Sequence, residues 1–322
     1  AVEGRRLSAP RIVVATGSRP AIPDLPGLAD VPYLTNETVF DLAELPRHLV
    51  ILGAGAIGLE MAQAFRRLGA AVTVIEAGPP LPRHDPEAVA LLLGQLAAEG
   101  VTVRTNTRAT RISPAPDGVR VEATPGAPVL GSHLLLAAGR RPTLDGLGLD
   151  TAGIAATPAG ITVDRRRRTS NPHVLAIGDC RAGPRFTHAA GYEGTVAVMR
   201  IGLGLPAAAD YAALPSVIYT DPELAQLGLT EAEAQEKHRD VRVHREAFAD
   251  NDRAIADGAP DGFAKLIVAG DRRNDGRHGR WRPAAAMEPG DARQGLALGG
   301  KRRHRALPDP VRHLESPGIR GL

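Results

Sequence analysis

The sequence contains a single cysteine, Cys180, among its 322 residues. One thiol excludes a disulfide framework, a cysteine-based zinc site and an internal dithiol pair. Aromatic residues amount to 3%, and no apolar stretch approaches the ~20 residues that a membrane-spanning helix needs. The first residues have neither an initiator Met nor the order of regions that marks a signal peptide. We therefore expect a soluble protein with no membrane partner, cytoplasmic by default.

Lysine is also scarce, with three residues against 36 Arg. The formal net charge of +3 is unevenly distributed, because residues 270–322 hold eleven Arg and one Lys against four Asp and two Glu. The basic character belongs to this segment and gives no argument for a nucleic-acid partner of the remaining chain. The same segment has nine Gly and five Pro without a hydrophobic period, which is typical of a disordered tail.

Residues 48–76 carry the clearest local pattern. HLVIL predicts a strand, GAGAIG a tight turn, and AVTVIE a second strand. Between them, apolar residues recur at the helical period on a stripe formed by Ile57, Met61, Ala64, Phe65 and Leu68. A strand, a helix and a strand within thirty residues predict a βαβ unit with parallel pairing and a right-handed crossover.

The glycine turn of this unit is a candidate dinucleotide-binding loop. Its first glycine permits a tight turn, the second lets the backbone approach a pyrophosphate, and the third allows close helix–strand packing. The first turn of the following helix offers free N–H groups to phosphates. The loop residues are Gly53, Ala54, Gly55, Ala56, Ile57 and Gly58. The alternative is a glycine turn that serves packing alone.

Two acidic residues extend this interpretation. Glu76 ends the second strand, where a carboxylate can accept hydrogen bonds from the hydroxyls of an adenosine ribose. An acid there favours NAD(H) over NADP(H), whose 2′-phosphate it would repel. Glu60, near the start of the helix, either faces the nicotinamide or is simply an acid favoured by the helix dipole.

Other segments have weaker local signals. Residues 11–15 predict a buried strand that ends at Gly17, and residues 172–178 predict another that leads to Asp179. The Asp179 carboxylate either binds a polyol hydroxyl or caps the next helix, over about 187–203. In isolation His188 is interpreted as a structural or surface histidine, and Cys180 lacks the partner thiol that redox chemistry needs. From about residue 209 the pattern predicts a separate α+β domain.

Several motifs occur together in one order: ATGSRPAIPDLPGL, ILGAGAIGLEMAQAFRRLGAAVTVIE, LLAAGRRP, HVLAIGDC, FTHAAGYEGTVAV, YTDPELAQLGLTEAEA and DNDRAIADG. In this order they resemble the pyridine nucleotide–disulfide oxidoreductases, the group of dihydrolipoamide dehydrogenase, glutathione reductase and mercuric reductase. The resemblance covers about residues 1–268. It implies an α/β fold in which a Rossmann-like NAD(P) domain interrupts an FAD domain and an α+β dimerisation domain follows.

The resemblance also implies site residues and domain bounds. It makes Thr16, Gly17 and Asp179 FAD contacts, and it puts Gly139 near the NAD site. The segment beside the flavin comprises Arg185, Phe186, Thr187 and His188. The expected domains are a partial FAD domain over 1–47 and 148–208, an NAD(P) domain over 48–147, an incomplete dimerisation domain over 209–269 and a tail over 270–322.

Departures from the family pattern are equally informative. The family's first FAD fingerprint and its CxxxxC redox disulfide are absent, and so is the late His-Pro…Glu segment that supplies an acid–base histidine. The activity implied is hydride transfer from NAD(P)H through FAD to a disulfide or metal-ion acceptor. We expect this polypeptide to lack catalytic and metal-binding residues of its own and not to form the family homodimer. The alternative function is an inactive NAD-binding fragment.

Overall fold

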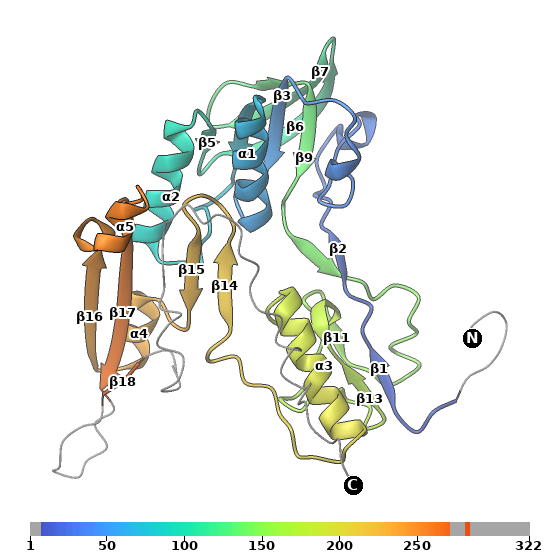
Figure 1. Ribbon diagram of the computed structural model, residues 1–322. Helices are drawn as coiled ribbons and strands as arrows, with labels where there is room; N and C mark the ends of the chain where they lie inside the picture. The colour runs from blue at the N-terminus through green and yellow to red at the C-terminus, as the bar shows by residue number, and fades with distance from the viewer. Residues whose placement is uncertain (1–7, 271–280, 284–322) are drawn as a thin grey trace, which may run out of the picture.

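The computed structural model describes residues 8–270 and 281–283. At its centre lies a parallel four-stranded sheet in the order β5-β4-β3-β9. The strands are β3 (His48–Leu52), β4 (Ala71–Ile75), β5 (Thr102–Arg104) and β9 (His133–Leu136). Helix α1 (Ala56–Leu68) connects β3 to β4, and α2 (Pro86–Ala98) connects β4 to β5. The predicted βαβ unit is therefore confirmed (Figure 1).

Both faces of this sheet are buried, because side chains alternate along each strand. Leu49 and Ile51 of β3 pack into the core that α1 and α2 cover. Val50 and Leu52 point the other way, into a second core under the antiparallel meander. That meander consists of β6 (Arg108–Ala115), β7 (Gly118–Thr124) and β8 (Val129–Gly131). Strands buried on both faces read as continuous apolar runs, which is why they were predictable from sequence.

The buried face of α1 agrees only in part with the predicted stripe. Met61 and Phe65 pack against the core as predicted, but Ala64 is exposed and the Leu68 side chain is 67% exposed. The fully buried residues of α1 are Gly58, Leu59, Ala62 and Gln63. The correction has a steric reason: the small residues Gly58 and Ala62 let the helix approach the strands closely, and hydropathy alone gives them little weight.

A second unit lies beside the first and contains two parallel strands, β1 (Ile12–Val14) and β13 (Val174–Ala176), with helix α3 (Thr187–Ile201). The prediction of a buried strand over 11–15 is wrong in burial, since Ile12 is 51% and Val13 40% exposed. Among the described residues β1 pairs with β13 alone, so one edge of β1 has no paired strand there. A small hairpin, β11 (Ala156–Thr157) and β12 (Gly160–Ile161), completes this unit.

An antiparallel ribbon joins the two units. Strand β2 (Ser18–Pro20) pairs with β10 (Arg140–Pro142), which follows β9 of the central sheet directly. Figure 1 shows this ribbon as the link between the central sheet and the unit that holds α3.

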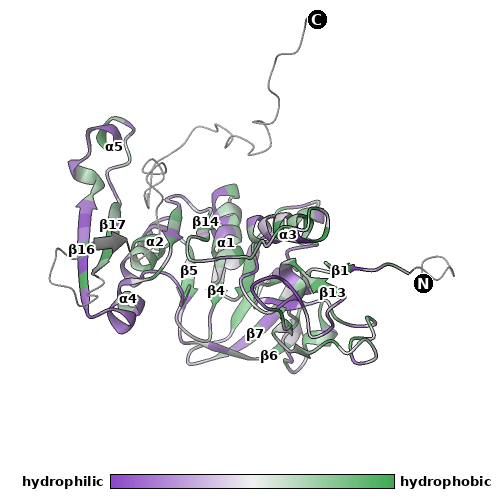
Figure 2. Ribbon diagram, turned by 90° about the horizontal axis from the view of Figure 1, so that it is seen from below, coloured by the Kyte–Doolittle hydropathy of each residue, from purple (hydrophilic) through white to green (hydrophobic). Residues whose placement is uncertain are grey.

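The remaining described residues form an antiparallel α+β unit. It contains β14 (Pro215–Ile218), β15 (Leu224–Leu227), α4 (Glu231–Lys237), β16 (Asp240–Ala247), α5 (Asp252–Ala256), β17 (Phe263–Gly270) and β18 (Trp281–Pro283). Figure 2 shows β16 as mainly hydrophilic and its neighbour β17 as mainly hydrophobic. Short 3-10 turns occur at Leu28–Asp30, Val39–Asp41, Gly178–Cys180 and Phe248–Asp250. No helix among the described residues is long and apolar enough to cross a membrane.

Strand β18 corrects the expectation that residues 270–322 lack regular structure. Residues 281–283 pair with Val268–Gly270 through the backbone. Because ladder hydrogen bonds come from the main chain, an edge strand can pair with a segment that has no strand-like composition. The rest of the predicted tail lies outside the described residues.

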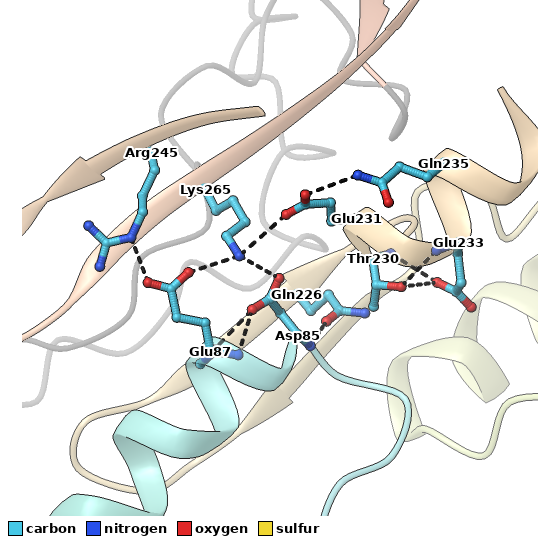
Figure 3. A network of polar contacts seen from close by, with 10 residues as sticks. Asp85, Glu87, Gln226, Thr230, Glu231, Glu233, Gln235, Arg245 and Lys265 are labelled. Atoms are coloured by element: carbon cyan, nitrogen blue, oxygen red, sulfur yellow. Dashed lines mark hydrogen bonds and ion pairs between the residues drawn. The ribbon is translucent and has the colours of Figure 1, made fainter. Parts of the chain in front are cut away.

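Lys265 joins this antiparallel unit to the central unit (Figure 3). Its ammonium group lies 3.0 Å from Asp85 Oδ2, 2.9 Å from Glu87 Oε2 and 3.8 Å from Glu231 Oε2. Asp85 also caps α2 by accepting hydrogen bonds from the N–H groups of Glu87 and Ala88. An ammonium group has three donors, which suits three surrounding carboxylates better than a planar guanidinium does.

We expect the Lys265→Met substitution to destabilise the protein by about 2 kcal/mol, because it leaves the carboxylate of Asp85 buried without its cation. The value lies below that of a fully buried pair, since the Glu87 side chain is 40% exposed. Lys237→Met, at an exposed lysine of α4, is the matched control and should shift stability by less than about 0.5 kcal/mol. Urea denaturation measures both variants, and equal effects would contradict the assignment.

The difference between wild type and Lys265→Met also has a predicted pH range. Burial opposes the charged form of Lys265, but hydrogen bonds to Glu87 and Asp85 outweigh it and raise its pKa. The hydrogen bond from Lys265 lowers the pKa of Glu87. The contribution of Lys265 is lost as pH rises through its raised pKa, and that of Glu87 as pH falls through its lowered pKa. We expect a constant difference between about pH 5 and pH 10 and a smaller one outside that range.

Candidate functional site

The glycine turn after β3 packs tightly against the sheet at two of its three glycines. Gly53 has φ 110°, and a Cβ there would lie 2.4 Å from the carbonyl oxygen of Ala137. A Cβ on Gly58 would lie 1.9 Å from the carbonyl oxygen of Gly53. Gly55 differs, because a Cβ at this position would meet nothing within 4 Å. Packing therefore explains Gly53 and Gly58 but leaves Gly55 unexplained.

The N-terminus of α1 has no side-chain cap. Gly55 occupies the N-cap position and has no side chain that could accept a hydrogen bond. The N–H groups of the first helical residues, Ala56, Ile57 and Gly58, therefore receive no side-chain cap from it. At the start of α2, by contrast, the Asp85 carboxylate accepts two such bonds. An uncapped helix N-terminus presents donors and a positive dipole end, which suits a phosphate group.

Glu76 lies beside this turn and binds it directly. Its Oε2 atom accepts a hydrogen bond of 2.8 Å from the N–H of Ala54, and its Oε1 atom accepts one of 3.0 Å from the N–H of Gly78. A carboxylate oxygen has a second lone pair, so both atoms can also accept from a ribose hydroxyl. The structure places Glu76 at the end of β4 beside the glycine turn and adds a structural contact that the sequence did not predict.

Glu60 lies on α1 and contacts the antiparallel unit. Its Oε1 atom accepts a hydrogen bond of 2.9 Å from the N–H of Tyr219. Burial raises the pKa of Glu60, and the Tyr219 N–H partly offsets this. The Tyr219 side chain itself is 67% exposed.

The carboxyl ends of three neighbouring strands define a path for an extended ligand. Glu76 follows β4, the glycine turn follows β3, and Gly139 follows β9 on the far side of β3. Gly139 has φ 107°, and no atom lies within 4 Å of the position its Cβ would take. In open parallel sheets, nucleotides bind in the crevice outside these strand ends.

Asp179 lies in a second polar cluster at the start of the β2–β10 ribbon. Its Oδ2 atom accepts a hydrogen bond of 2.7 Å from the hydroxyl of Ser18 and lies 3.9 Å from Nε of Arg140. Arg140 in turn donates to the Ser18 hydroxyl and to the Ser18 carbonyl, both at 2.7 Å. Because Arg140 follows Gly139 directly, this cluster links the end of the central sheet to the turn that carries Asp179.

The neighbouring predicted residues hold the same region through the backbone. The Thr16 hydroxyl donates to the carbonyl of Thr143 at 2.7 Å. Gly17 has φ 69°, and its carbonyl accepts from the N–H of Thr143 at 2.9 Å. Arg185 donates to the carbonyls of Arg140 at 2.8 Å and Ala159 at 2.9 Å. Thr16, Gly17 and Arg185 therefore gather around the connection between the two units.

The start of α3 carries the last predicted segment. Phe186 occupies the N-cap position without a side-chain hydrogen bond, and Thr187 is the first helical residue. The rings of Phe186 and His188 stack with centroids 5.2 Å apart. His188 is exposed, and its Nε2 donates to the carbonyl of Pro215 at 2.9 Å.

Sequence reasoning missed a buried charged cluster behind Asp179. Glu193 is fully buried and forms ion pairs with Arg167 and Arg181, and it accepts a hydrogen bond from the Tyr211 hydroxyl. Its Oε2 atom accepts a hydrogen bond of 2.7 Å from the N–H of Gly178, next to Asp179. Burial, and after it the hydrogen bond to Glu193, raises the pKa of Tyr211 to about 12. Arginines in an arginine-rich sequence give no signal of such burial.

Cys180 is fully buried, and its thiol lies 3.2 Å from the carbonyl of Ile177. Within the described ranges, no group of three or more His, Cys, Asp or Glu side chains is arranged to hold a metal ion.

Comparison with known proteins agrees with this architecture. The family model of the pyridine nucleotide-disulphide oxidoreductases matches residues 1–194, and the model of their dimerisation domain matches residues 214–274. The second match extends beyond Val268, where the sequence resemblance was expected to end.

Individual relatives share about two fifths of the aligned residues. A dihydrolipoyl dehydrogenase of Geobacillus stearothermophilus is 40% identical over 270 residues, which cover 82% of this chain and 56% of that protein. A mercuric reductase of Acidithiobacillus ferrooxidans is 38% identical over 262 residues, 80% of this chain and 47% of that protein.

Solved structures give the same result. The flavoprotein disulfide reductase RclA of Escherichia coli, induced by HOCl, superposes with a TM-score of 0.74 and 31% identity over 80% of this chain and 60% of its own. LpdA of Mycobacterium tuberculosis gives a TM-score of 0.74 at 30% identity, over 80% of this chain and 57% of its own. The chain spans about half the length of the curated relatives that it matches. On these matches, the chain belongs to the pyridine nucleotide-disulphide oxidoreductase family.

Proposed function

We propose that this chain binds NAD(H) across the carboxyl ends of β4, β3 and β9 and presents the nicotinamide to an FAD held near Asp179. The path along the strand ends carries this proposal. It begins at Glu76, passes the uncapped start of α1 and ends at Gly139. The next residue, Arg140, contacts Ser18 and approaches Asp179. The nicotinamide end of the path therefore leads to the residues assigned to the flavin.

Each part of the path binds a different part of the dinucleotide. The N–H groups at the start of α1 hold the pyrophosphate, and the open space at Gly55 lets it approach the backbone. Glu76 accepts the adenosine ribose hydroxyls, and its charge repels the 2′-phosphate of NADP(H). Glu60 and Gly139 lie toward the nicotinamide end. This arrangement favours NAD(H) as the natural cofactor.

The flavin side rests on residues whose donors and acceptors fit a polyol and an isoalloxazine ring. The Asp179 carboxylate, oriented by Ser18, accepts hydrogen bonds from ribityl hydroxyls. Arg185 is fixed by two carbonyls, and α3 begins without a side-chain cap, so its first N–H groups are available to the carbonyl oxygens of an isoalloxazine ring. When bound, FAD supplies the group that accepts a hydride from NADH.

The names of the relatives support a disulfide or a metal ion as the final electron acceptor of a complete enzyme. Such a reaction needs a dithiol, and these 322 residues contain one thiol, which is buried. We propose that this polypeptide by itself binds NAD(H) and lacks disulfide reductase activity. It would then keep the nucleotide-binding part of the family function and otherwise correspond to the alternative, an inactive NAD-binding fragment. The proposed domains are an FAD domain from 1–47 and 148–208, an NAD domain over 48–147 and a dimerisation domain from 209.

Two glycine substitutions separate binding from packing. Gly55→Ala should destabilise the fold by less than about 1 kcal/mol, because the position is open and its backbone is extended, and only the preference of an N-cap for glycine over alanine is lost. It should raise the dissociation constant for NADH at least about tenfold, or about 1.4 kcal/mol, since the methyl group occupies the space of the pyrophosphate. Gly58→Ala should destabilise the fold by about 2 kcal/mol. Calorimetric titration and urea denaturation measure the two effects, and unchanged NADH binding by Gly55→Ala would refute the phosphate site.

The cofactor preference depends on Glu76. Wild type should bind NADH more tightly than NADPH, and Glu76→Arg should shift the ratio of the two dissociation constants about tenfold toward NADPH. Glu122→Arg, on the surface of β7, makes the same change of charge away from the turn and should leave the ratio unchanged. A wild type that prefers NADPH tenfold would show that the assignment of Glu76 is wrong.

Cys180 is expected to take no part in electron transfer. With NADH and added FAD, thiol release from a model disulfide should stay at the background rate, because the only thiol is buried and bonded to backbone carbonyls. Cys180→Ser should give the same rate. Turnover above background that disappears in Cys180→Ser would overturn the proposal of inactivity.

A further inference from the structure

The connection between β14 and β15 reaches onto one face of α1. Three helix positions spaced at three and four residues hold it: Glu60, Gln63 and Arg67. Glu60 accepts from the N–H of Tyr219 at 2.9 Å, and Arg67 donates to the Asp221 carboxylate at 2.9 Å. Between them, the Gln63 side chain accepts from the N–H of Asp221 at 2.8 Å and donates to the carbonyl of Asp221 at 2.7 Å. The Gln63 carboxamide thus pairs with the backbone as a neighbouring strand would.

Gln63 is 4% exposed, and its amide has a second acceptor, Glu99 Oε1, at 3.1 Å. Glu99 is held in turn by Arg67, through bonds of 2.7 and 2.9 Å, and by Gln95 at 2.9 Å. Leaving a buried amide without hydrogen-bond partners raises the free energy of the folded state. If the segment Tyr219–Asp221 moves away from α1, the Gln63 side-chain oxygen loses its hydrogen bond and the amide nitrogen keeps only its bond to Glu99.

We infer that Gln63 is a positioning residue for the nicotinamide half of the NAD(H) site, because it holds Tyr219–Asp221 against α1 and so fixes the carboxylate of Glu60. This inference rests on the proposed function. It makes the affinity of the central unit for NADH depend on a segment of the antiparallel unit. Among the described residues, Glu76 and the glycine turn, which mark the adenosine and pyrophosphate positions, make no hydrogen bond or ion pair with Tyr219–Asp221, so binding there should not depend on Gln63.

The test compares NADH with ADP-ribose, which lacks the nicotinamide. Calorimetric titrations of the full 322-residue chain use wild type, Gln63→Met and the matched control Gln95→Met, which also loses an amide bond to Glu99 but does not touch the segment. Gln63→Met should weaken NADH binding about fivefold or more and leave ADP-ribose binding unchanged. Gln95→Met should change neither affinity by more than about twofold.

Equal weakening of both ligands, or no weakening by Gln63→Met, would overturn the positioning role while leaving the proposed NAD(H) site intact. A wild type that binds neither ligand would remove the proposed function and this inference with it. If Gln63→Met does not fold, Arg67→Met replaces it in the test. The Arg67 side chain is 44% exposed, so its substitution disturbs the core less, and it removes the ion pair that holds the Asp221 carboxylate. It should weaken NADH at least about twofold and ADP-ribose not at all.

Discussion

The close approach of α1 to the end of β3 is the contact on which the proposed site depends. Gly58 packs against the carbonyl of Gly53, and no larger residue fits there. Glu76 then ties the turn to the end of β4 through the N–H groups of Ala54 and Gly78. The turn is therefore held on two sides before any ligand binds. A site organised in advance spends less binding free energy on ordering its own backbone.

Two other units are connected to the region around this turn and α1. From one side, Gln63 and Glu60 tie α1 to the antiparallel unit. From the other, Gly139 leads through Arg140 to Ser18 and Asp179. Strand order explains why both connections meet here, because β9 lies next to β3 and carries the chain directly into the ribbon. The geometry thus brings the proposed nicotinamide end close to the proposed flavin residues without a long intervening loop.

The central fold was predictable because its strands are continuous apolar runs and its first helix lies between glycines. The positions of Gly53–Gly58 and Glu76 follow from the same pattern. Burial on α1 was not predictable, since a glutamine at Gln63 reads as a solvent-facing residue and an apolar Leu68 reads as core. The contacts of Gln63 and Arg140 join segments 158 and 122 residues apart in the chain, and no local period encodes such pairings. For the same reason Arg181 gave no sign of its burial beside Glu193.

The central claim is that NAD(H) lies across the strand ends of the central sheet. Hydrogen–deuterium exchange with and without NADH tests it most directly, because it reports on every backbone amide of the chain. The account predicts added protection over the turn from Gly53 to Glu60 and around Glu76–Gly78, with further protection near Gly139. Protection confined to other segments, or none at saturating NADH, would contradict it.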